Sequence, residues 1–166
     1  HAGSVVSETT TAAVSAGSAV FWGILLGGLF AVAFYLLEPT LPGRGDAKAY
    51  VLAGAGFLSV SVTPWLVLPP AAPGAVHRYG IDTRLAAYLG LVVVGIGLSA
   101  AAIGAYKRLA SRHVGLAVLA ASVPVLAAVA LSTLAPTIAT HPDIPADLVA
   151  AYRGLVVLTQ AALWFL

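Results

Sequence analysis

The residues of this sequence best suited to chemistry are imidazole and carboxylate groups on two short polar segments. His77 follows a run of prolines, while His141 and Asp143 are separated by one residue on a second, proline-bounded segment. Ligands of these types suit borderline divalent ions such as cobalt, nickel or zinc. If the two segments converge, His77, His141 and Asp143 are predicted to form a metal-collecting mouth, although their spacing matches no known metal signature. Solvated loop residues are the alternative interpretation.

A second set of polar residues follows at helical spacing inside an apolar run. Arg153 and Gln160 are seven residues apart and therefore share a helix face, which Asp147 extends. A cation inside a membrane needs a partner, and Asp147, Asp143 or Asp82 could supply a carboxylate, unless the side chain reaches outward to the surface. This intramembrane stripe predicts either a hydrophilic path or substrate contact, or interhelical hydrogen bonding that fixes the bundle.

Several classes of function are excluded by what the sequence lacks. The chain has no cysteine, which removes disulfides, thiolate metal sites and thiol catalysis. Its serines lie mostly within apolar runs, with no serine–histidine–aspartate arrangement and no glycine-rich phosphate loop. The formal net charge of +2 is too small and scattered for nucleic-acid binding. We therefore expect no enzyme and no nucleic-acid partner.

The elements that must position these residues are membrane-spanning helices. The chain is 60% hydrophobic and only 8% charged, with a mean hydropathy of +0.99. Its apolar residues form runs of roughly 20 residues, the length needed to cross about 30 Å of hydrocarbon. The sequence predicts an all-α integral membrane bundle of about five transmembrane helices in a single domain, residues 1–166, with the lipid bilayer as its first partner. The predicted spans are residues 16–37, 49–68, 83–106, 114–134 and 147–166.

Prolines and basic residues refine this arrangement. Pro64 and Pro124 lie inside the second and fourth spans and are predicted to kink them. Lysine and arginine concentrate in segments 38–48 and 107–113, which should be cytoplasmic. Residues 1–15, 69–82 and 135–146 should then lie outside. At the start of the third span, Asp82 and Arg84 are predicted to anchor the helix at the membrane interface rather than to take part in transport.

The start of the chain also suggests an expectation. The sequence begins at His1 and contains no methionine. Together with an N-terminus on the outer side, this predicts that an upstream segment is missing, either a cleaved signal peptide or one more membrane span.

Three stretches of the sequence resemble the CbtA family, whose members are described as probable cobalt transporter subunits. The end of the second span and the following loop, residues 63–73, read TPWLVLPPAAP. The start of the third span, residues 81–88, reads IDTRLAAY. The last loop and helix begin with HPDIPADL at residues 141–148 and continue with Tyr152-Arg153, Thr159-Gln160 and Trp164. The order and spacing of these stretches are similar to those of the family along most of the chain.

The resemblance implies a multi-pass protein of the prokaryotic cell membrane that forms part of a divalent transition-metal uptake system, with cobalt as the ion. It implies a further N-terminal span, an outward histidine-bearing loop of which His1 is the last remnant, and a small CbtB-like single-span partner with histidines of its own. A bound divalent metal such as cobalt would be the cofactor. The alternative is a non-catalytic accessory subunit that packs against a larger membrane complex, and its faces of small residues also permit a homo-oligomer.

Overall fold

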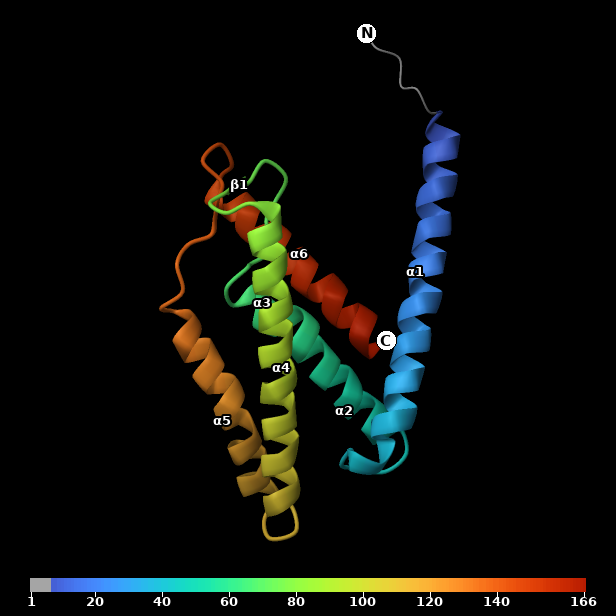
Figure 1. The fold of residues 1–166 in the computed structure, drawn as a ribbon, viewed down its shortest axis with the longest axis vertical. Helices are drawn as coiled ribbons and strands as arrows, with labels where there is room; N and C mark the ends of the chain where they lie inside the picture. The colour runs from blue at the N-terminus through green and yellow to red at the C-terminus, as the bar shows by residue number, and fades with distance from the viewer. Residues whose placement is uncertain (1–6) are drawn as a thin grey trace. The chain divides into compact units, whose positions relative to one another are not determined.

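The computed structural model describes residues 7–166, in a chain that divides into two compact units, residues 1–40 and residues 41–166 (Figure 1). His1, which the family resemblance assigns to an outward loop, lies outside the described residues. The described chain is helical with only two short strands, and four of its helices are long and apolar enough to cross a bilayer. The prediction of an all-α integral membrane protein is confirmed.

The N-terminal unit consists of one long helix, α1, which spans Glu8–Leu37 and continues into a 3-10 turn, η1, at Glu38–Thr40. The Ser7 hydroxyl accepts a hydrogen bond from the Thr10 backbone N–H and so caps the first turn of α1. The helix has no buried residue, although its sequence is strongly apolar. Such a helix is stable where hydrocarbon rather than water surrounds it.

The C-terminal unit begins with a helical segment that changes geometry in its middle. α2 spans Asp46–Phe57, a π-helical turn, η2, spans Leu58–Val62, and the short helix α3 spans Thr63–Trp65. The three follow one another without a gap and cover most of the predicted second span, residues 49–68. None of them is long enough to count alone as a membrane helix, so the number of five spans in one domain stays a prediction.

Three long helices complete the C-terminal unit: α4 at Ile81–Leu109, α5 at Val114–Ser132 and α6 at Ala146–Phe165. A short basic turn joins α4 to α5, and the two helices pack along each other (Figure 1). The His113 Nδ1 accepts from the Leu116 backbone N–H at 3.3 Å and caps α5. α2 packs against α6, while η2 and α3 pack against α4.

Glycines allow the closest approaches between these helices. A Cβ atom added at Gly95 of α4 would lie 2.6 Å from the Ser59 Cα of η2, too close for any side chain. Likewise, a Cβ added at Gly56 of α2 would clash with the Trp164 ring of α6. Small residues at helix contacts are the usual means by which membrane helices reach van der Waals distance.

Two short strands join the loops at one end of this unit. β1, at Val76–His77, pairs antiparallel with β2, at Ala139–Thr140, with Val76 opposite Thr140 and His77 opposite Ala139. The Arg78 backbone N–H extends the ladder by donating to the Ile138 carbonyl at 2.9 Å. The loops before α4 and before α6 therefore converge, as the metal-mouth hypothesis requires (Figure 1).

Candidate functional site

Pro64 explains why the second helical segment changes geometry. Proline has no backbone N–H, and its ring collides with the carbonyl of the residue four positions earlier in an α-helix. That residue is Val60, which lies in the π-helical turn η2. The Tyr88 hydroxyl of α4 donates a hydrogen bond to the Val60 carbonyl at 3.1 Å. A side chain of the neighbouring helix thus supplies a donor that Pro64 cannot, in a region where water is scarce.

Pro124 does not interrupt its helix. It lies inside α5, but the helix runs through it from Val114 to Ser132. A π-helical turn thus precedes Pro64, while α5 is one element, and the kinks predicted at Pro64 and Pro124 stay predictions.

Hydroxyl groups connect η2 to α4 next to this turn. The Ser59 hydroxyl donates to the Ala55 carbonyl at 2.7 Å, and the Ser99 hydroxyl of α4 donates to the same carbonyl at 3.2 Å. The two Oγ atoms are 3.1 Å apart. In the described residues the buried Thr63 Oγ1 has no hydrogen-bond partner. This cluster fixes the helix pair and holds no group capable of acid–base or nucleophilic chemistry at neutral pH.

His141 helps to hold the two converging loops together. Its Nε2 accepts a hydrogen bond from the Ala72 backbone N–H at 3.0 Å, which ties β2 to the proline-rich loop. An Nε2 that accepts carries no proton, so in this arrangement the neutral ring bears its proton on Nδ1. Gly74 lies between Ala72 and β1 and has a φ of +86°, a conformation that other residues rarely adopt. It therefore allows the proline-rich loop to turn at this point.

Arg153 ties α6 to the same loop. Its Nε donates to the Pro70 carbonyl at 3.1 Å, and the side chain is half-buried. A carboxylate or an outward-reaching side chain was expected, but the partner in the structure is a main-chain oxygen, while Asp82, Asp143 and Asp147 are exposed. Gln160 is half-buried two turns further along α6. The structure therefore gives Arg153 a structural contact, and a transport role for the stripe stays a prediction.

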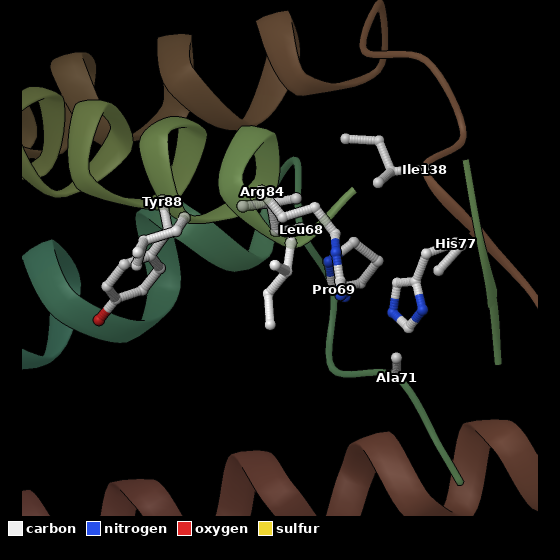
Figure 2. A pocket seen from close by; sticks show the side chains of 10 residues that line it. Leu68, Pro69, Ala71, His77, Arg84, Tyr88 and Ile138 are labelled. Carbon is white, nitrogen blue, oxygen red and sulfur yellow. The ribbon is translucent and has the colours of Figure 1, made fainter. Parts of the chain in front are cut away.

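A cavity of about 420 Å³ lies beneath the joined loops, between the proline-rich loop, α4 and β2 (Figure 2). Most of its walls are apolar, and its lining residues include no aspartate or glutamate. They are Leu68, Pro69, Ala71, His77, Ile81, Arg84, Leu85, Tyr88, Ile138 and Ala139. The Arg84 Nε is buried and has no hydrogen-bond partner within residues 7–166. The cavity thus combines an unsatisfied guanidinium donor and an imidazole with an apolar surface.

The structure brings the predicted metal ligands to one end of the unit without gathering them into a cluster. His77 lines the cavity, His141 binds the proline-rich loop, and Asp143 is exposed on the loop before α6. Within the described part of the chain, no group of three or more histidines, aspartates or glutamates could hold a metal ion. Metal binding at His77, His141 and Asp143 stays a prediction.

Two residues of the site have a larger role than the sequence indicated. Arg84, expected to anchor its helix at the interface, reaches the cavity, and Tyr88 contacts the main chain of η2. The position of Pro64 could have indicated that Val60 needs a donor. Only the packing of α4 shows which side chain provides it.

The fold and the site define a class: a multi-pass α-helical membrane protein whose histidine-bearing loops are joined at one end. The chain belongs to the CbtA family, described as probable cobalt transporter subunits, which matches it over residues 1–166. The suspected family is thereby confirmed. No curated protein and no solved structure matches the chain.

Proposed function

We propose that this protein is a membrane subunit of an uptake system for a divalent transition metal, with cobalt as the ion. The observation that carries the proposal is the β1–β2 pairing, which brings the segments of His77 and His141 together in a chain that belongs to a family of probable cobalt transporter subunits. Imidazole and carboxylate groups at one mouth are suitable ligands for such an ion.

The ligand set is completed by a partner subunit. A transition-metal site in a protein commonly needs three or more protein ligands, and the His141 Nε2 is engaged by the Ala72 N–H. His77, the exposed Asp143 and His141, once its Nε2 leaves the Ala72 N–H, therefore supply part of the shell. Histidines of a CbtB-like single-span protein supply the rest. Metal transfer between the two proteins follows from this division.

The proposed sidedness puts the mouth on the outer face of a prokaryotic cell membrane. Segments 38–48 and 107–113 are cytoplasmic because they carry most of the lysine and arginine in short loops. Segments 69–82 and 135–146 are outside. The strand pairing supports a common side for these last two segments.

The test is uptake of radioactive Co²⁺ by cells that produce the protein together with its partner. His77→Asn removes an imidazole from the mouth, and His141→Gln removes another while keeping an acceptor for the Ala72 N–H. We expect each to reduce the apparent affinity for Co²⁺ by about tenfold or more, the size seen when support for a metal site is lost. His113→Asn is the matched control, because asparagine also caps a helix.

Unchanged Co²⁺ uptake in both mouth variants would contradict the metal role. If the level of a larger membrane complex then depended on the presence of this chain, the accessory-subunit alternative would replace it. The same strains thus separate a subunit that handles the ion from one that only stabilises its neighbours.

A further inference from the structure

The cavity beneath the joined loops has the charge of an anion site. Arg84 lies in the first turn of α4, where the buried Nε–H has no acceptor among the described residues. A guanidinium remains charged in proteins, and a buried donor without an acceptor is unfavourable. No carboxylate lines the cavity to balance it. We propose that this cavity binds the phosphate group of an anionic lipid, with Arg84 as its main donor.

The polar groups of the cavity suit an oxyanion. Figure 2 shows the Arg84 side chain extending from α4 toward the side of the cavity that carries His77. A guanidinium presents several N–H groups in one plane and can donate two of them to the same phosphate. The imidazole of His77 has at least one N–H in either protonation state and serves as a second donor. The Tyr88 hydroxyl is already engaged with the Val60 carbonyl.

The apolar walls favour a lipid over a free phosphate ion. Ile81 and Leu85 line the cavity and lie four residues apart on α4, on one face of the helix. They are 72% and 57% exposed, so the edge of the cavity borders the lipid-facing surface of α4. Arg84 belongs to the first turn of a membrane-spanning helix, at the depth of the lipid headgroups. A headgroup can therefore enter sideways while its acyl chains stay along α4.

The same features argue against a metal ion inside the cavity. A guanidinium repels a divalent cation, and the lining offers no carboxylate to offset it. The lipid site shares only His77 with the proposed metal mouth, and its main donor, Arg84, has no part in that mouth. The lipid proposal therefore does not depend on the proposed function. Its test needs no measurement of cobalt.

The experiment measures retention of phosphatidylglycerol by the protein, purified in neutral detergent, using native mass spectrometry. We expect a single phosphatidylglycerol molecule bound per chain, with its affinity reduced about tenfold in Arg84→Gln, as befits the loss of a charge-assisted hydrogen bond. Arg78→Gln is the matched control, because Arg78 is exposed, lies in the loop that leads into α4 and has its guanidinium 5.8 Å from the Tyr79 ring centre. Ala139→Leu keeps the guanidinium but fills the cavity, and it should weaken binding even if Arg84→Gln does not fold.

Two ligand controls identify the source of the phosphate. Diacylglycerol with the same acyl chains lacks the phosphate and should not be retained, and inorganic phosphate should not displace the lipid. The proposal would be overturned if both cavity variants retained phosphatidylglycerol as well as the unmodified protein does. It would also be overturned if Arg78→Gln lost as much of the lipid as Arg84→Gln, or if diacylglycerol were retained as well as phosphatidylglycerol. If inorganic phosphate displaced phosphatidylglycerol, the lipid would be ruled out as the specific ligand and the cavity would be assigned to a free phosphate ion.

Discussion

At the scale of single residues, three polar side chains near the proline-rich loop and the π-helical turn bind the main chain rather than one another. His141 accepts from the Ala72 N–H, Arg153 donates to the Pro70 carbonyl, and Tyr88 donates to the Val60 carbonyl. A proline-rich loop and a π-helical turn cannot satisfy all of their own backbone groups. Polar residues that look functional in the sequence thus also serve as donors and acceptors for irregular backbone.

His141 tests this structural role directly. Replacing it by alanine leaves the Ala72 N–H without its acceptor and should lower the free energy of unfolding by about 1 kcal/mol. His141→Gln provides a new acceptor and should cost less. The measurement is the thermal unfolding midpoint of the purified protein in detergent. Equal midpoints for His141→Ala and the unmodified protein would show that the His141–Ala72 bond contributes nothing.

Tyr88 and Pro64 should be energetically coupled. Tyr88→Phe removes the donor to the Val60 carbonyl and should destabilise the protein by about 1 kcal/mol. In a Pro64→Ala background the new backbone N–H can serve that carbonyl, so the same tyrosine substitution should cost much less. A double-mutant cycle on unfolding free energies measures this difference. If the two effects simply add, the Tyr88 hydroxyl does not compensate for Pro64.

At the scale of elements, the contact between η2 and α4 depends on one glycine. A Cβ at Gly95 would meet the backbone of Ser59, which cannot move aside as a flexible side chain can. The two helices can approach this closely only where a side chain is missing.

We expect Gly95→Ala to force these helices apart and to cost about 1–3 kcal/mol, the usual penalty for overpacking. Gly97→Ala, on the same helix, is the matched control, because nothing lies within 4 Å of its added Cβ. It should be neutral or slightly stabilising, since alanine favours helices over glycine. Comparison of unfolding midpoints checks the pair, and equal midpoints would mean that η2 does not pack closely on α4.

The elements show how far hydropathy predicts this fold. Apolar runs located the helices α1, α4, α5 and α6 because bilayer thickness fixes the length of a span. The interruption at Leu58–Val62 was expected only as a kink at Pro64. A proline indicates where helical hydrogen bonding fails but not the geometry that replaces it, which depends on the neighbouring helix.

At the scale of the whole molecule, the proposed sidedness can be tested with single cysteines, because the native chain has none. Val76→Cys and Thr137→Cys lie in exposed positions of the two joined loops, and Ser111→Cys lies in the turn between α4 and α5. In intact cells a membrane-impermeant maleimide should label the first two, and label Ser111→Cys only after permeabilisation. Labelling of Ser111→Cys in intact cells would reverse the proposed orientation.

The candidate site was predictable in part. The sequence indicated that the segments of His77 and His141 lie on one side of the membrane, and the strand pairing brings them together. Its cavity was not predictable, because Arg84 and Ile138 are distant in sequence and meet only through the pairing of loops. Periodicity and hydropathy describe single helices, whereas a cavity arises from the packing of several.

The pairing of β1 with β2 has a mechanical consequence for α4 and α5. The chain enters this helical hairpin at Arg78 and leaves it at Ile138, two residues joined by a hydrogen bond of 2.9 Å. The two attachment points of the hairpin therefore coincide, so a load on α4 or α5 reaches the connections to α3 and to α6 at one hydrogen-bonded pair of residues.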